Sequence, residues 1–206
     1  GRIHDSREAE AAVKQAQDAG FDDINLDLMF ALPQQTPAMA ETDVERAIAL
    51  APAHVSHYQL TLEPNTVFAV RTPEGLPDED TAWTMQEACQ ARLAAAGYAQ
   101  YEISAYARPG RQCAHNLNYW RFGDYLGIGA GAHGKLTLGS ERSILRRWKH
   151  KHPARYLATA GTAGVIGGDE RIAPEQRPFE FMLNALRLRE GFTLALFRAR
   201  TGLDDE

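Results

Sequence analysis

Cysteine is scarce in this chain: Cys89 and Cys113 are the only two among 206 residues, and they lie in separate segments. Two cysteines without a CxxC pair exclude a disulfide framework, and their spacing predicts neither a zinc site nor an iron–sulfur site. Low cysteine usage of this kind suits a reducing compartment, so we expect a cytoplasmic protein. Cys89 falls on a predicted helix and is expected to be a small buried apolar residue.

Long apolar runs and an excess of positive charge are lacking too. No run approaches the roughly 18 apolar residues of a membrane span, so no stable membrane insertion is expected. Residues 1–10 have no apolar core and do not predict a signal peptide. The net charge of −5 argues against a general nucleic-acid-binding protein, which usually carries a basic face. What remains is a composition typical of a globular protein.

The predicted elements alternate between helix and strand. Helices are expected over residues 5–19, 38–50 and 78–96, and strands over 24–29, 54–60 and 98–104. This alternation predicts βαβ units with a parallel sheet, and therefore an α/β fold. A strand over 143–148, a helix over 153–159, a glycine-rich loop over 161–168, and helices over 174–189 and 193–200 follow. The glycine-rich loop predicts a boundary between two domains, residues 1–168 and 169–206.

Strand periodicity indicates where polar side chains of the first two strands lie. One face of the first strand carries Asn25 and Asp27, and one face of the second carries His57 and Gln59. In a closed parallel barrel these four side chains would line one cavity, whereas in an open sheet they would form a polar edge. His54 and His57 are three residues apart on one strand, so they are not expected to bind the same ion.

Residues 113–134 hold the densest mixture of chemically active side chains, and we expect this mixture to form neither a plain helix nor a core strand. His115 can ligate a metal or a heme iron, and the rings of Tyr119 and Trp120 can stack on a flat macrocycle. The alternative is that His115 caps a loop and that the two rings belong to the core. His133 follows a glycine run at positions 127, 129, 131 and 134, which predicts a tight turn, with or without a ligand beside it. The run lacks the context of a dinucleotide-binding turn.

A basic segment follows the glycine run, with Trp148 and Tyr156 inside it. Its members are Arg142, Arg146, Arg147, Lys149, Lys151 and Arg155. Such a segment can be a solvated strand and helix face, a site for a small anion, or a nucleic-acid contact. Sequence patterns by themselves therefore indicate an α/β protein with a ligand site and do not identify the ligand.

Four segments are more specific than these patterns, because they resemble the radical SAM family of oxygen-independent coproporphyrinogen III oxidase-like proteins. They are NLDLMFALPQQT (25–36), HVSHYQLTLEPNTVF (54–68), YEISAYARPGRQCAHNLNYWRFGDYLGIGAGAHG (101–134) and PFEFMLNALRLREGF (178–192). The HNxxYW form at 115–120 is similar to that of the heme chaperone branch. The family's CxxxCxxC motif, which holds a [4Fe–4S] cluster, is absent from this sequence. The resemblance thus implies the later part of a partial (β/α)6 radical SAM barrel, then the start of a helical C-terminal domain.

The resemblance also implies roles for individual residues. Asp27, Gln59 and His133 match positions that bind S-adenosylmethionine, and the heme motif comprises His115, Asn116, Tyr119 and Trp120. We add the hypothesis that Arg146, Arg147 and Lys149 meet the heme propionates. No catalytic residue and no cluster ligand is assigned in this chain.

The implied function is that of a heme chaperone, which binds heme and S-adenosylmethionine and delivers heme to respiratory proteins. One alternative is an oxygen-independent coproporphyrinogen III dehydrogenase, which oxidatively decarboxylates propionates in heme biosynthesis. Another is a nucleotide-binding module that uses the glycine-rich turn.

Overall fold

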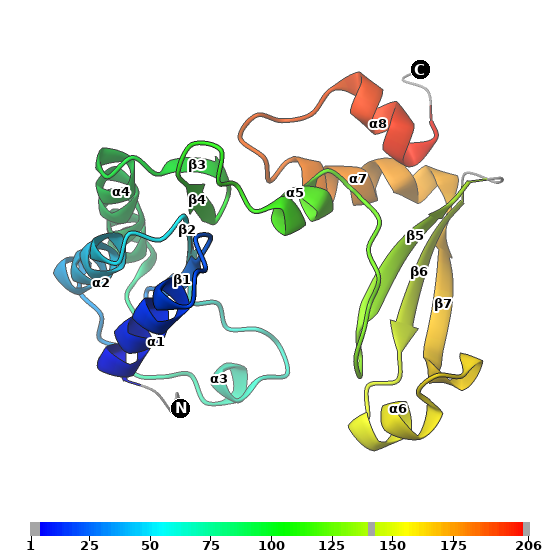
Figure 1. Ribbon diagram of the computed structural model, residues 1–206, viewed down its shortest axis with the longest axis horizontal. Coiled ribbons are helices and arrows are strands. Elements are labelled where there is room, and N and C mark those ends of the chain that lie inside the picture. Colours follow the sequence, from blue (N-terminus) through cyan, green and yellow to red (C-terminus); the bar gives the residue numbers. More distant parts are fainter. Residues whose placement is uncertain (1–4, 140–142, 204–206) are drawn as a thin grey trace. The chain divides into compact units, whose positions relative to one another are not determined.

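The computed structural model describes residues 5–139 and 143–203, which form two compact units, Gly1–Cys113 and Ala114–Glu206 (Figure 1). The division differs from the expected boundary at 168/169, because that position falls inside a strand, β7 (Ile166–Ile172), which pairs within the second unit. The two units are described separately below.

Unit 1 contains a four-stranded mixed sheet in the order β1-β2-β4-β3. Strands β1 (Asn25–Phe30) and β2 (His54–Gln59) are parallel, as the alternation with helices predicts. Strands β3 (Ala99–Glu102) and β4 (Ala105–Ala107) are antiparallel, and β4 also pairs antiparallel with β2. The prediction of a parallel sheet throughout is therefore wrong. The run expected as one strand over 98–104 turns back after Glu102, and β4 takes the place beside β2.

The helices of unit 1 begin at side-chain caps that are readable in the sequence. Helix α1 (Ser6–Asp18) starts at a capping box made by Asp5 and Glu8, and α2 (Pro37–Ala49) starts at Thr36. Helix α4 (Glu79–Ala95) starts at Asp78, and a short helix α3 (Val67–Val70) precedes it. Helices α2 and α4 pack with one face of the sheet around a core that includes Val44, Val55, Met85, Cys89, Leu93 and Tyr98. Cys89 is buried there, as predicted.

Unit 2 contains an antiparallel sheet of β5 (His133–Leu138), β6 (Ser143–Lys149) and β7, in that order. Its helices are α5 (Ala114–Trp120), α6 (Pro153–Thr159), α7 (Arg177–Ala185) and α8 (Leu194–Thr201). The expected elements at 143–148 and 153–159 are confirmed, whereas α5, β5 and β7 were not predicted. The core is formed by Phe122, Ile144, Ile172, Phe181 and Ala185. On α7 it is Phe181 that is buried, while Phe179, Leu183 and Leu186 are exposed.

Strand β7 begins within the glycine-rich loop that was expected over residues 161–168, so its first three residues, including Gly167 and Gly168, were not expected in a strand. The indole of Trp148 on the neighbouring strand lies against Gly168, and a Cβ at this position would collide with the ring. The glycine therefore makes room for an aromatic ring within a strand, which is one of the recognised uses of glycine in a sheet. Among the described residues, no helix is both long and apolar enough to cross a membrane.

Candidate functional sites in the two units

The first candidate site lies on the face of the unit 1 sheet opposite the α2–α4 core. Register pairs Asn25 with His54 and Asp27 with Ser56, so these four side chains share that face. The amide nitrogen of Asn25 donates to Asp27 Oδ1 at 2.9 Å. The amide oxygen of Asn25 lies 2.6 Å from His54 Nδ1 and accepts from the hydroxyl of Ser56 at 3.1 Å. A connected polar network thus ends at the exposed carboxylate of Asp27.

His54 anchors this network beneath the surface. It is 5% exposed, and its Nε2 lies 2.8 Å from the hydroxyl of Tyr101. Burial lowers the pKa of His54, and the nearby carboxylate of Asp27 raises it in opposition. The net effect is a lowered pKa, which favours a neutral imidazole at neutral pH.

The sequence-based grouping of Asn25, Asp27, His57 and Gln59 on one face is wrong. His57 stacks on Phe30 with ring centroids 4.5 Å apart and points into the α2–α4 side of the sheet. Burial lowers the pKa of His57 to about 4, so it behaves as an aromatic core residue. Gln59 pairs in register with Phe30 and lies exposed at the end of β2, on the opposite face from Asp27. The parallel register Asn25–His54, which the residue pattern does not reveal, decides these faces.

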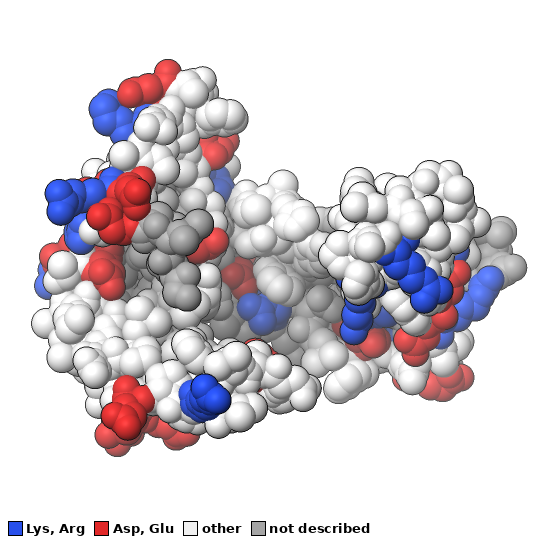
Figure 2. Space-filling model, turned by 90° about the horizontal axis from the view of Figure 1, so that it is seen from below, with Lys and Arg blue, Asp and Glu red and all other residues white. Residues whose placement is uncertain are grey.

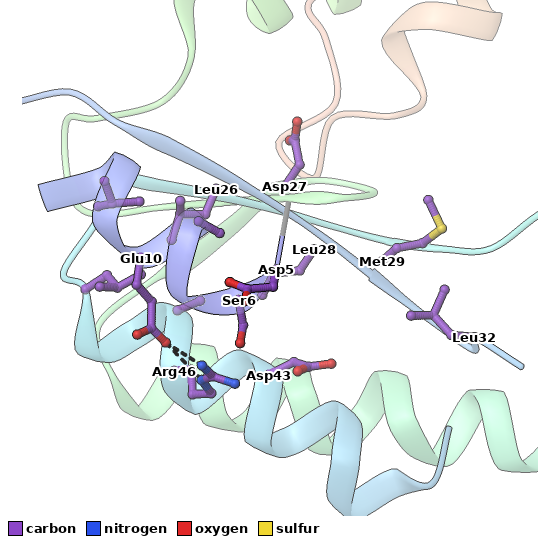
Figure 3. Close-up of a pocket in the computed structure, with 14 residues that line it drawn as sticks. Asp5, Ser6, Glu10, Leu26, Asp27, Leu28, Met29, Leu32, Asp43 and Arg46 are labelled. Atoms are coloured by element: carbon purple, nitrogen blue, oxygen red, sulfur yellow. Dashed lines mark hydrogen bonds and ion pairs between the residues drawn. The ribbon is translucent and has the colours of Figure 1, made fainter. Parts of the chain in front are cut away.

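A cavity of about 300 Å³ lies between α1, β1 and α2. Its lining includes Asp5, Asp43 and Leu28, together with Arg46, which is paired with Glu10. Figure 3 shows the Asp27 side chain on the opposite side of β1 from Arg46 and Asp43. Asp27 is nevertheless among the residues that line the cavity, so the cavity reaches β1 at the residue whose carboxylate points to the polar face.

The second candidate site lies on α5 in unit 2. The side chain of His115 is exposed, and its ring meets Tyr119 edge to face with centroids 4.8 Å apart. Tyr119 in turn packs on Tyr125 with centroids 4.4 Å apart. The sequence therefore forms a helix where none was expected, and one helical turn places the imidazole beside the tyrosine. Tyr125 completes this aromatic row and was not identified from the sequence.

The other two residues of the heme motif lie on the same helix. Asn116 is half-buried. The guanidinium of Arg187 lies 4.2 Å from the centroid of the Trp120 ring, a cation–π contact. The Nε1 atom of Trp120 is buried without a hydrogen-bond partner among the described residues. Trp120 thus faces its own unit more than His115 does.

The glycine-rich turn connects this row to the sheet. Tyr125 and Lys135 exchange two backbone hydrogen bonds, of 2.9 and 3.0 Å, so the start of the turn runs beside β5. A Cβ at Gly127 would collide with the carbonyl of His133, so the chain's own backbone requires this glycine. The turn leads into a strand and not into a helix, so it lacks the helix N-terminus of a dinucleotide-binding turn. His133 is exposed and stacks on Trp148, with centroids 6.0 Å apart.

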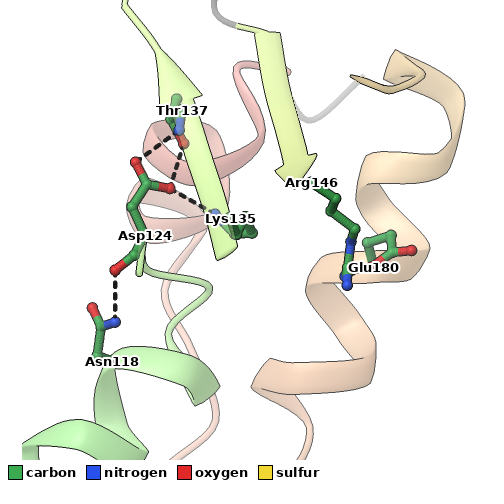
Figure 4. A network of polar contacts seen from close by, with 6 residues as sticks. All are labelled: Asn118, Asp124, Lys135, Thr137, Arg146 and Glu180. Atoms are coloured by element: carbon green, nitrogen blue, oxygen red, sulfur yellow. Dashed lines mark hydrogen bonds and ion pairs between the residues drawn. The ribbon is translucent and has the colours of Figure 1, made fainter. Parts of the chain in front are cut away.

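Asp124 fixes the position of the turn through a buried cation (Figure 4). It accepts from Lys135 Nζ at 2.9 Å and from the backbone and hydroxyl of Thr137 at 2.8 and 2.9 Å. The amide of Asn118, on α5, donates to the Asp124 carbonyl at 2.9 Å. Helix α5, the turn and β5 are therefore held together by one polar network.

Two residues of the basic segment form ion pairs within the described part of the chain. Arg146 pairs with Glu180, and Arg147 pairs with Asp169 at 2.7 Å across β6 and β7. On the face shown in Figure 2, Lys and Arg stand beside Asp and Glu. Lys149 has no ion pair among the described residues, and Arg142 lies outside them. The arrangement favours a structural role for Arg146 and Arg147 and leaves their propionate contact as a hypothesis.

Comparison with known proteins places the chain among relatives of known name. It is 51% identical over 204 residues to "Heme chaperone HemW" of Haemophilus influenzae, which covers 98% of this chain and 51% of that protein. It is 48% identical over 206 residues to the HemW of Escherichia coli, covering all of this chain and 53% of the relative. The chain is a relative of the HemW proteins. It spans about half the length of the HemW proteins that it matches.

Two further comparisons agree with the HemW relationship. The HemN C-terminal domain family matches residues 172–205. The solved structure of coproporphyrinogen III oxidase (HemN) from Escherichia coli, a radical SAM enzyme, shares the fold with a TM-score of 0.75 at 19% identity. The alignment covers 98% of this chain and 49% of HemN. The expected similarity to coproporphyrinogen oxidase-like proteins, and to their heme chaperone branch, is therefore confirmed, as is a mixed α/β fold.

Proposed function

We propose that this chain is the heme-binding part, and one wall of the S-adenosylmethionine site, of a heme chaperone that delivers heme to respiratory proteins in the cytoplasm. One observation carries the proposal: His115 is an exposed imidazole at the head of the aromatic row Tyr119–Tyr125, within an HNxxYW motif. The HemW relatives, at 48–51% identity, support it.

The residues of α5 fit a heme group. An imidazole at the protein surface can ligate heme iron, and flat aromatic rings beside it can pack on the porphyrin. His115 supplies the first, and Tyr119 supplies the second at 4.8 Å from it. His115 would hold the iron of a bound heme and Tyr119 would contact the porphyrin, so that these residues orient the group and restrict the access of water.

The open face of unit 1 fits the adenosyl part of S-adenosylmethionine. A carboxylate such as Asp27 accepts hydrogen bonds from ribose hydroxyls or from an ammonium group. Gln59 ends β2 on the sheet face opposite Asp27, so it is not part of this open face. Gln59 and His133 each stay a prediction from the sequence resemblance, and the proposal does not rest on them. We propose that β1 and β2 belong to a partial radical SAM barrel, which longer relatives complete.

The chain does not fit a [4Fe–4S] cluster. Its two cysteines stand 24 positions apart, and the described residues contain no group of three or more His, Cys, Asp or Glu side chains that could hold a metal ion. The cluster ligands are therefore expected in a part of the protein outside this sequence, and no radical step is assigned to these residues.

A heme titration followed by the Soret absorption band tests the proposal. The chain should bind heme with a Soret shift, and His115→Ala should weaken binding by at least about tenfold, the equivalent of one lost ligand bond. His152→Ala is the matched control, because His152 is also exposed and makes no capping bond at α6. Unchanged heme affinity in His115→Ala would contradict the proposal.

Calorimetric titrations with the other two ligands, which have no Soret band, separate the alternative functions. Binding of a porphyrinogen without stable heme binding would favour a coproporphyrinogen III dehydrogenase, to which the fold likeness to HemN points. Affinity for NAD in the absence of both would favour a nucleotide-binding module, although the strand that follows the glycine-rich turn argues against it.

A further inference from the structure

The hydrogen bonds on the open face of unit 1 have a fixed direction. An ionised carboxylate only accepts hydrogen bonds, so the group that faces Asp27 Oδ1 at 2.9 Å must be the nitrogen of the Asn25 amide. The oxygen of that amide consequently faces His54 Nδ1, 2.6 Å away. This assignment follows from the chemistry of the partners, which is the proper basis for orienting an amide.

The direction continues through the histidine. Because Asn25 presents an acceptor to Nδ1, the neutral His54 ring must carry its proton on Nδ1 and accept at Nε2. The donor to Nε2 is the hydroxyl of Tyr101 at 2.8 Å, and both rings are buried. The tautomer of a buried histidine is thus linked, through one amide, to an exposed carboxylate.

We propose that His54 and Asn25 are positioning residues that hold the carboxylate of Asp27 ready for a ligand hydroxyl or ammonium group. Oδ1 of Asp27 is engaged by Asn25, whereas Oδ2 accepts no hydrogen bond from the described residues. Oδ2 is thereby available to a ligand on the exposed side of the strand. The ligand class rests on the proposed function, in which this carboxylate meets the ribose or amine of an adenosyl compound.

The anchoring through His54 is what makes positioning effective. If only the amide and the carboxylate were in contact, both exposed side chains could change rotamer. A ligand would then have to order them on binding, and this loss of conformational entropy would reduce its affinity. Besides its contact with Asp27, the Asn25 side chain is hydrogen-bonded to the buried imidazole of His54 and to the hydroxyl of Ser56. The ordering of Asp27 is therefore completed when the chain folds, before any ligand arrives.

Nitrogen-15 NMR of the histidine side chains of the whole chain tests the direction of the network. The His54 resonances, assigned with His54→Asn, should show the tautomer protonated on Nδ1 at neutral pH. Tyr101→Phe removes one hydroxyl oxygen and should reduce the fraction of that tautomer, because Nε2 loses its donor. Observation of the Nε2–H tautomer in the unsubstituted chain would overturn the proposal.

Calorimetric titration with S-adenosylmethionine tests the consequence for binding. Asn25→Leu should weaken binding by about tenfold, as expected for loss of one charge-assisted hydrogen bond, and Tyr101→Phe should weaken it by a smaller factor. Tyr98→Phe is the control, because this buried hydroxyl donates instead to the carbonyl of Pro52 in the core. Unweakened binding in Asn25→Leu would overturn the proposal.

The two measurements separate this inference from the function on which it rests. If the unsubstituted chain shows the Nδ1–H tautomer but does not bind S-adenosylmethionine, the positioning network is supported and the proposed adenosyl site fails. If it binds and His54 is protonated on Nε2, the adenosyl site is supported and the positioning network fails.

Discussion

Lys135 shows how a single residue holds the candidate heme site of unit 2 together. Its side chain is 3% exposed and lies 4.2 Å above the ring of Phe122, with Asp124 as its anion. Burial lowers the pKa of Lys135, and the hydrogen bond to Asp124 raises it in part. A cation in such a place depends on its partner, because an unpaired buried charge is strongly destabilising.

Replacement of Asp124 by Asn should therefore destabilise unit 2. The side chain of Asp124 is 38% exposed, so we expect a loss of about 2 kcal/mol at neutral pH, below the range for fully buried pairs. Urea unfolding measured through probes in unit 2 gives the loss. Glu190→Gln, which removes an exposed partner of Arg121, should cost less than about 1 kcal/mol.

The same pair predicts a pH dependence with a definite sign. Burial raises the pKa of Asp124. The hydrogen bonds from Lys135 and Thr137 together lower the pKa by more than burial raises it, so the net shift is downward. A lowered folded pKa stabilises the fold above the unfolded pKa and loses this effect as the pH falls through the folded pKa. The stability gap between the unsubstituted chain and Asp124→Asn should thus narrow below about pH 4. A gap that stays constant from pH 6 to 3 would argue against the pairing.

The two cysteines should differ in reactivity. Burial, with Glu41 and Asp43 adding to it, raises the pKa of the Cys89 thiol to about 11. The thiolate is the reactive form, so Cys89 should resist alkylation while the protein is folded. In Cys113→Ser, labelling with iodoacetamide at neutral pH should reach one equivalent only in denaturant. Rapid labelling of that variant under native conditions would show that Cys89 is accessible.

At the scale of elements, the β5–β6–β7 sheet gives unit 2 its frame. The indole of Trp148 in the central strand lies between His133 on β5 and Gly168 on β7. Such cross-strand packing stabilises a sheet whose register would otherwise be weakly specified. Helix α5 is attached to this frame by the Asn118–Asp124 hydrogen bond.

Gly168→Ala tests this packing. The added methyl group would collide with the Trp148 ring, and overpacking of this kind typically costs about 1–3 kcal/mol. Tryptophan fluorescence during unfolding reports the change. Gly139→Ala is a matched control, because a Cβ there meets nothing within 4 Å. Equal stability of the two variants would mean that the indole does not occupy this position.

At the scale of the whole molecule, two separate cores imply two units of stability. Val55 belongs to the first core and Phe181 to the second, and both are fully buried. Large-to-small substitutions at such positions cost about 2–5 kcal/mol, most for Phe→Ala. Each substitution should therefore raise the rate of amide hydrogen exchange only in the unit whose core contains the substituted residue.

The expected pattern is that Val55→Ala speeds amide exchange within residues 5–113, and that Phe181→Ala speeds it within residues 114–203. Local opening of this kind follows cooperative units that have their own cores. Acceleration of both segments by either substitution would indicate one cooperative structure.

The sequence by itself determined the elements with local signals and the relationship to known proteins. Asp5, Thr36 and Asp78 begin helices because a side-chain oxygen can satisfy a free backbone amide wherever the chain folds. The HNxxYW segment and its neighbours likewise identified the HemW relationship. Short-range signals of this kind do not depend on distant parts of the chain.

Only the tertiary structure decided which side chains meet. The register of β1 against β2 places His57 in the core and brings His54, Asn25 and Asp27 into one hydrogen-bonded network. Strand β4 pairs with β2, which the sequence pattern does not predict. Gly168, which the sequence pattern assigns to a loop, lies in β7 because the indole of Trp148 occupies the space where a side chain would be. Each of these outcomes depends on contacts between residues far apart in the chain, whose geometry is set by packing and cannot be read from local pattern.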